Sequence, residues 1–275
     1  MMKFTIRLYA FFTLAIFVSV APAHAQFQRR TTSDPATGEK YHIEGAAGFW
    51  FPTADMSIQS ESLGIPGSTI DFKKDLGLTD QHFSQVQAVL RPAKKHKFRF
   101  QFIPISYDQE HTLTRTIVFN GQAYTVGVPV ISQLKWNAYR FGYEYDFLYH
   151  NRWFAGFMLE TKYTDVQANL KIAPPSTTSE FAHARGPIPA IGGIVRVYFL
   201  PNASITGELS GIDIPTIQDK YKAHYADFDL YGTLNVINNV GVQVGYRSLD
   251  VGYLFKTDTG NFTVKGLYFG VVARY

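Results

Sequence analysis

Two short groups of residues have the side-chain types that hydrolysis requires. His224 stands close to Asp227 and Asp229, and His82 stands close to Ser84. A histidine beside a carboxylate can activate water, and a histidine beside a serine can activate its hydroxyl group. Neither group fits the motif of a specific enzyme, and eight histidines scattered over 275 residues produce such neighbours by chance. We therefore expect no catalytic residues and keep a hydrolase using these His and Asp residues, near predicted loops, as the alternative.

Metal and cofactor sites have little support in the sequence. The chain has no cysteine, which excludes thiolate ligands and disulfides. The histidines lack a His-x-x-x-His spacing, and the acidic pairs lack the pattern of a calcium-binding loop. Gly192 and Gly193 follow no strand that leads into a helix, so they do not indicate a phosphate-binding loop. We expect neither a metal nor a cofactor.

Most of the charged residues fall on one face of alternating segments. In Ser132 to Leu148, for example, aromatic residues alternate with charged ones. The predicted inward set, in which cations and anions nearly balance, is Glu44, Arg99, Arg140, Glu144, Asp146, Glu160, Lys162, Arg196, Glu208, Asp227, Asp229, Arg247 and Arg274. These charges could form a salt-bridged plug or line a narrow polar passage. We favour the plug because balanced charge suits pairing better than selection of one ion sign.

Ten segments show the two-residue period of strands that have one apolar and one polar face. They are Tyr41 to Phe51, Phe83 to Leu90, Phe98 to Gln109, Ser132 to Leu148, Trp153 to Val166, Ala190 to Leu200, Ser204 to Ile212, Tyr225 to Val236, Gly241 to Phe255 and Phe262 to Tyr275. The last segment ends on an aromatic residue. Its predicted lipid face holds Leu267, Phe269, Val271 and Ala273, and Tyr275 follows. This pattern predicts an all-β, antiparallel, up-and-down transmembrane barrel.

The connections between these segments alternate between short and long. The long ones are Pro52 to His82, Glu110 to Ile131, Ala168 to Pro189 and Asp213 to His224. We expect them to be outer loops, with a raised hairpin at Asn120-Gly121. If the arms of that hairpin crossed the membrane, the strand number would be twelve, and eight is the other alternative.

Two places disturb the strand pattern. The apolar parity changes at Arg247 to Leu249, which predicts a β-bulge or the point where the strand leaves the membrane. Pro104 predicts an end of regular pairing nearby. The run Lys94 to Lys97 is expected to be a solvated turn.

The N-terminus has the features of an export signal. Met1 to Ala25 holds two cations, an apolar run and Ala23-His24-Ala25, which predicts cleavage before Gln26. Gln26 to Lys40 is then a flexible arm and residues 41–275 are the barrel. Without the two cations of the signal, the chain has 24 basic and 22 acidic residues. This near-neutral balance gives no support for nucleic-acid binding.

Together, the export signal, the alternating strands and the aromatic terminal strand resemble small single-domain outer-membrane β-barrel proteins of Gram-negative bacteria. The resemblance implies a monomer in the outer membrane that contacts membrane lipid and lipopolysaccharide. It also implies that the barrel-assembly machinery recognises the terminal strand. Some barrels of this type are proteases or lipid-modifying enzymes. We expect a non-enzymatic barrel with a structural, surface-interaction or narrow-channel role.

Overall fold

The computed structural model describes residues 36–61, 65, 67–174, 178–218 and 220–275. The predicted signal peptide and residues 26–35 of the predicted arm lie outside this part of the chain. Within it, no helix is long and apolar enough to cross a membrane.

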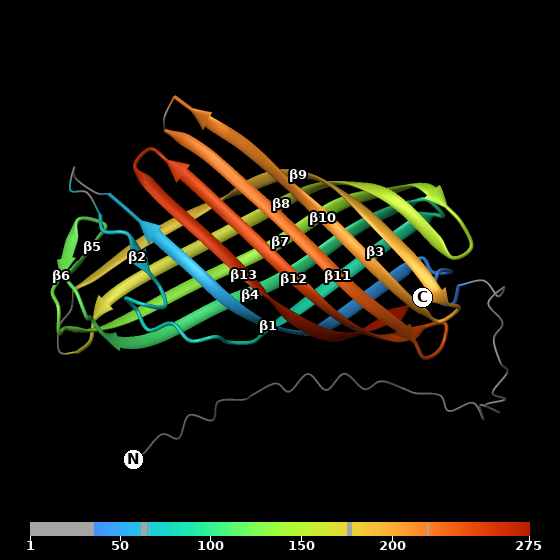
Figure 1. Ribbon diagram of the computed structural model, residues 1–275, viewed down its shortest axis with the longest axis horizontal. Coiled ribbons are helices and arrows are strands. Elements are labelled where there is room, and N and C mark those ends of the chain that lie inside the picture. Colours follow the sequence, from blue (N-terminus) through green and yellow to red (C-terminus); the bar gives the residue numbers. More distant parts are fainter. Residues whose placement is uncertain (1–35, 62–64, 66, 175–177, 219) are drawn as a thin grey trace, which may run out of the picture. The chain divides into compact units, whose positions relative to one another are not determined.

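Ten antiparallel strands form a closed ring (Figure 1). The ring strands are β1 (Ile43–Gln59), β3 (Phe83–Ala93), β4 (His96–Thr112), β7 (Pro129–Tyr149), β8 (Trp153–Ile172), β9 (Ser179–Leu200), β10 (Ala203–Ile217), β11 (Tyr221–Asn235), β12 (Val240–Phe255) and β13 (Asp258–Arg274). Each ring strand pairs with its neighbours in the chain, and β13 pairs with β1 to close the ring. The predicted up-and-down barrel of ten strands is confirmed, and the alternatives of eight and twelve strands are wrong.

The Asn-Gly hairpin lies outside the ring, as the sequence predicts. It consists of β5 (Ile117–Phe119) and β6 (Gln122–Tyr124), which form a separate two-stranded sheet. Asn120 and Gly121 join them with φ values of 49° and 81°. This left-handed backbone suits Asn and Gly, so the turn chemistry explains the hairpin.

The ring strands are longer than the sequence predicts. A strand that crosses a membrane needs about 9–11 residues, whereas β7, β8 and β9 have 21, 20 and 22 residues. Large parts of the predicted loops are therefore barrel wall. We call the half of the barrel next to Glu44 and Arg274 the proximal half, and the half next to β5 and β6 the distal half.

Prolines mark the places where the wall of the distal half opens. A proline has no N–H group, so it fits a paired strand only where its nitrogen faces away from the partner. Pro52 of β1 is paired with β13, and Pro104 of β4 is paired with β7, but the pairing of both strands with β3 ends just before these residues. The prediction from Pro104 therefore holds on the β3 side and fails on the β7 side.

A second opening lies between β9 and β10. These strands pair only as far as Ile191 and Gly211, although β9 continues along β8 to Ser179. Pro187 and Pro189 occupy β9 just beyond the last pair. Figure 1 shows the distal ends of β9 and β10 diverging.

The first opening, between β1 and β4, is covered by residues 67–82. A short strand in this segment, β2 (Ile70–Asp71), pairs with Ser57 and Ile58 of β1. The Ala54 backbone N–H donates to Asp80 Oδ1 over 3.4 Å, and the Thr79 hydroxyl donates to Gln109 of β4 over 3.4 Å. The segment thus covers the opening and joins the sheet only through the two residue pairs of β2 with β1.

The polarity of the two faces reverses along the strands, and β12 shows this most clearly. In the proximal half the outward residues Val242 and Val244 are exposed, while Arg247 points inward and is buried. Further along, Leu249 is buried inside and Asp250 is exposed outside. The register of β12 with both neighbours is continuous, so no bulge is present. The change in the apolar pattern at Arg247 to Leu249 instead marks the place where the apolar face of β12 switches from the outside to the inside of the barrel.

An apolar core fills the distal half. Its largest fully buried side chains include Trp50, Trp136, Tyr107, Tyr124 and Phe119. Residues 67–82 add Phe72, Leu76 and Leu78 to the same core. The covering segment is therefore anchored to the interior of the barrel by these three side chains.

Candidate functional site in the lumen

The proximal half encloses a network of charged side chains. All thirteen residues of the predicted inward set are buried, and none is more than 7% exposed. They come from nine of the ten ring strands and point toward the axis, because alternate residues of a strand share one face. The structure therefore brings together the residues that the sequence grouped.

Glu208 lies at the centre of one part of the network. Its carboxylate accepts from Arg99 over 2.6 Å, from Arg140 over 3.0 Å and from the Tyr231 hydroxyl over 3.0 Å. Arg140 also donates to Glu160 over 2.5 Å. Each carboxylate here faces more than one donor, as the burial of a charge requires.

Asp227 lies at the centre of a second part of the charge network, which is nearer to the distal half. Arg247 donates to both of its oxygens, over 3.0 and 2.7 Å, and Lys162 donates to it over 2.6 Å. Lys162 also pairs with Glu160 over 3.1 Å, and Arg247 donates to the Gln101 oxygen over 2.7 Å. Glu160 thus links the two parts into one network.

Lys97 belongs to the network, although the sequence placed it in a solvated turn. Its ammonium group is 2.6 Å from Glu144 and 2.9 Å from Asp146, and the residue is only 2% exposed. The strand β4 begins at His96, so only Lys94 and Lys95 remain in the turn. Lys97 stands two residues before Arg99, so the same alternation that places Arg99 inside the barrel could have placed Lys97 there too.

The end of the predicted arm supplies another carboxylate. Glu39 lies 2.9 Å from Arg196, accepts from the Tyr198 hydroxyl over 2.6 Å and pairs with Arg91 over 3.4 Å. Burial raises the pKa of Glu39, but Arg196 and Lys97, together with the bond from Tyr198, outweigh burial and hold the pKa below its ordinary value. Arg91 and Glu39 were both missed, because neither belongs to an alternating pattern of charges.

The arm also makes contacts at the proximal end of the barrel. The Thr37 N–H donates to the Pro201 carbonyl over 2.6 Å, and Asn235 donates to the Thr37 carbonyl over 2.6 Å. Beside them, Arg274 donates to Glu44 over 2.6 Å. The prediction of a flexible arm did not include these contacts, which hold residues 36–40 in place.

The structure does not bring His224 together with its two candidate partners. Asp227 and Asp229 point into the lumen, whereas His224 lies three residues from Asp227 on the same strand and therefore on the opposite face. His82 is exposed and stacks on Phe51, with ring centres 5.6 Å apart. The constellation of His224 with the two aspartates is therefore wrong as a catalytic site. Across the described residues, no group of three or more His, Asp or Glu side chains could hold a metal ion.

Comparison with known proteins places the fold. No family model and no curated protein matches the sequence. Among solved structures, the outer membrane protease OmpT from Escherichia coli matches with a TM-score of 0.57 at 9% identity, over 89% of this chain and 100% of OmpT. The toluene transporter TodX of Pseudomonas putida matches with a TM-score of 0.35 at 9% identity, over 88% of this chain and 92% of TodX. Ail, the attachment invasion locus protein of Yersinia pestis, matches with a TM-score of 0.35 at 8% identity, over 85% of this chain and 97% of Ail.

The chain therefore has the fold of a Gram-negative outer-membrane β-barrel. At 9% identity the likeness to OmpT shows this fold and carries no residue of its protease site to this chain.

Proposed function

We propose that this protein is a closed, non-enzymatic barrel of the outer membrane that conducts no solute. The observation that carries the proposal is the pairing in the lumen. The six cations of the predicted set, together with Lys97 and Arg91, each form an ion pair with a carboxylate whose side chain is at most 9% exposed. A pore selects ions with charges that face water, and these charges face one another.

The distal half supports the same proposal. Its interior is filled by a dense apolar core that includes Trp50 and Trp136, each at most 1% exposed. A hydrated solute that left the charged layer would have to cross this core, which offers it few polar partners. The paired charges of the proximal half and the apolar core of the distal half would thus both block a solute, which favours a closed lumen.

The placement of apolar side chains supports insertion in a membrane. Leu267, Phe269 and Val271 of the terminal strand are each more than half exposed, and the next residue, Val272, is fully buried. This is the arrangement of a barrel strand with one face toward lipid. We include in the proposal that the barrel is a monomer in contact with lipopolysaccharide, and that the assembly machinery recognises Leu267, Phe269, Val271, Ala273 and Tyr275.

Planar-bilayer recordings test the closed lumen. The purified full barrel should insert without steady conductance, while a general porin measured in the same bilayers serves as the positive control for detection. Folding of each sample is checked by its heat-dependent shift in gel mobility. Large and reproducible open channels from the unmodified protein would overturn the proposal and favour a passage through the lumen.

A further inference from the structure

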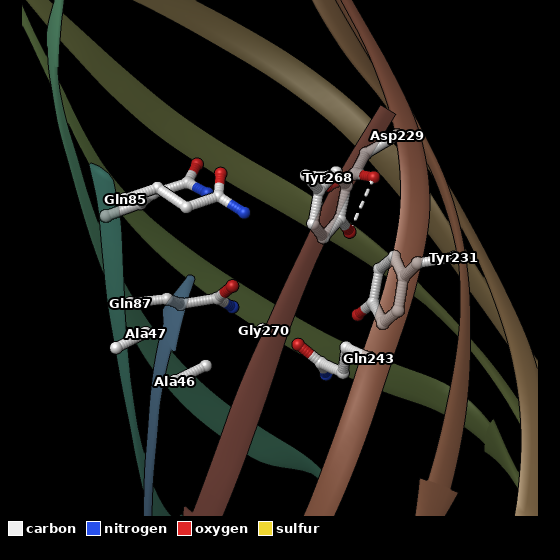
Figure 2. A pocket seen from close by; sticks show the side chains of 10 residues that line it. Ala46, Ala47, Gln85, Gln87, Asp229, Tyr231, Gln243, Tyr268 and Gly270 are labelled. Carbon is white, nitrogen blue, oxygen red and sulfur yellow. Dashed lines mark hydrogen bonds between the residues drawn. The ribbon is translucent and has the colours of Figure 1, made fainter. Parts of the chain in front are cut away.

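A small cavity lies beside Asp229 in the charged half of the lumen. Its volume is about 20 Å³, enough for one water-sized occupant. The cavity exists because β1 and β13 present Ala46, Ala47 and Gly270 at this level, where other strands present long side chains. Figure 2 shows the side chains of Gln85, Gln87 and Gln243 directed toward it from the surrounding strands.

Asp229 differs from the other carboxylates of the lumen because it has no ion pair within the described part of the chain. Arg247 is its partner in the register of β11 and β12. However, Arg247 donates to Asp227 and Gln101 instead. Asp229 is 7% exposed and accepts a hydrogen bond from the Tyr268 hydroxyl over 2.9 Å (Figure 2). A buried carboxylate in this state lacks a compensating charge.

Several groups around the cavity offer acceptor oxygens. Tyr268 donates its hydroxyl hydrogen to Asp229, so its oxygen keeps lone pairs that can accept. The Tyr231 hydroxyl donates to Glu208, and its oxygen already accepts from Arg196 over 3.1 Å. The Gln85 side-chain oxygen is buried and has no hydrogen-bond partner among the residues that the structure describes. Gln243 donates its amide hydrogen to Thr233 over 3.3 Å, which leaves its oxygen available. The carboxylate of Asp229 and the oxygens of Gln85, Gln243 and Tyr268 favour an occupant that supplies donors or positive charge.

We propose that the cavity binds one small monovalent cation, such as Na⁺ or K⁺, against Asp229. Its single carboxylate and several neutral oxygens suit a singly charged ion, whereas Ca²⁺ sites commonly combine several carboxylates with other oxygens. The volume admits a single atomic ion and excludes an organic cation such as choline. The cation is a resident part of the lumen, so the site goes beyond the closed-barrel function and does not depend on it.

The proposal is tested by unfolding the full barrel in detergent in NaCl, KCl or choline chloride at equal ionic strength. The thermal midpoint should rise by about 5–10 °C when Na⁺ or K⁺ reaches about 100 times its dissociation constant, and it should not rise in choline chloride. Sodium NMR relaxation on the same sample should detect bound ion. Equal midpoints in the three salts would overturn the proposal and leave water as the occupant.

Two variants locate the effect. Asp229→Asn keeps the shape and the acceptor for Tyr268 but removes the charge, so its midpoint should no longer depend on the cation. Gln85→Met removes the unpartnered oxygen and should raise the half-saturating cation concentration, which decides the question if Asp229→Asn does not fold. Asp250→Asn, an exposed outward carboxylate on β12, is the matched control and should respond like the unmodified protein. A full cation response in both cavity variants would place the ion elsewhere and overturn the proposal.

Discussion

The proximal and distal halves of this barrel share their ring strands, apart from β3, but have opposite polarity. In the proximal half, apolar side chains such as Val244 and Phe269 are exposed outside and paired charges fill the inside. In the distal half, polar residues such as Asp250 lie outside and aromatic and aliphatic side chains fill the inside. One continuous strand, β12, passes through both arrangements without a change of register. The change in which face is apolar therefore follows from what surrounds each half, lipid in the proximal half and water in the distal half, and not from a change in the backbone.

The two interiors also differ in how they tolerate change. An apolar core is stabilised by many small contacts, so removal of one side chain leaves a cavity with a local cost. A buried charge network depends on complete pairing, because one missing partner leaves an uncompensated charge. The proximal interior should consequently be more sensitive to single substitutions and more tolerant of paired ones.

The largest effect is expected from Arg247→Met. This change removes two hydrogen bonds to Asp227 and should lower the free energy of unfolding by about 3–5 kcal/mol. The double variant Arg247→Met with Asp227→Leu should recover most of the loss, because Lys162 keeps its pair with Glu160. Urea titrations of the barrel refolded into detergent measure both values. A double variant as unstable as the single one would show that the network acts mainly through packing.

A smaller effect is expected on the outer face, where two positions of β12 form a matched pair. Val244→Arg places a charge in the exposed apolar band and should cost about 2–4 kcal/mol in lipid vesicles. Asp250→Arg, on the same face of the same strand, should cost about 0.5 kcal/mol or less because that site faces water. Folding yields and urea midpoints in vesicles compare the two. Equal losses would contradict the placement of the membrane boundary between them.

The sequence predicts the proximal half well, for a physical reason. Lipid outside and charge inside impose a strict alternation, and Phe228, Leu230, Asp227 and Asp229 display it on adjacent positions of β11. That alternation identifies the ring strands and all thirteen inward charges. Lys97 follows the same rule but stands within a run of basic residues, which disguises it.

The distal half is not predicted, because its residues follow the reverse rule. Leu249 and Val251 break the parity that a membrane strand sets, so they suggest an irregularity instead of a second core. Pro52 and Pro189 suggest loops, although both lie in paired strands. The contacts of Glu39, and the pairing of Arg247 with Asp227 in place of Asp229, depend on the three-dimensional packing of distant strands, which no local pattern encodes.

The smallest effect is expected at the segment that covers the opening between β1 and β4. Arg115 donates to both oxygens of Asp75, over 2.7 and 2.6 Å, and this hydrogen bonding holds the pKa of Asp75 below its ordinary value of 3.8 although burial opposes it. A carboxyl group whose pKa is lowered on folding stabilises the fold above its unfolded pKa and loses that contribution as the pH falls through the folded pKa. The attachment of residues 67–82 should therefore be constant near neutral pH and weaken below about pH 4.

Arg115→Gln tests this attachment at a site where Arg115 is 48% exposed. A partly exposed ion pair contributes about 0.2–1 kcal/mol, so trypsin should cleave the variant after Lys73 or Lys74 up to about fivefold faster than the unmodified protein at neutral pH. Lys74→Gln is the control, because it removes only the exposed contact of Lys74 with Asp71 at 3.3 Å. Trypsin should cleave this variant after Lys73 at the same rate as it cleaves the unmodified protein after Lys73. With pepsin well below pH 3.8, where Asp75 becomes protonated, the difference between Arg115→Gln and the unmodified protein should disappear. A difference that persists in acid would mean that Arg115 holds the segment through its bond to the Thr69 carbonyl instead of through the charge of Asp75.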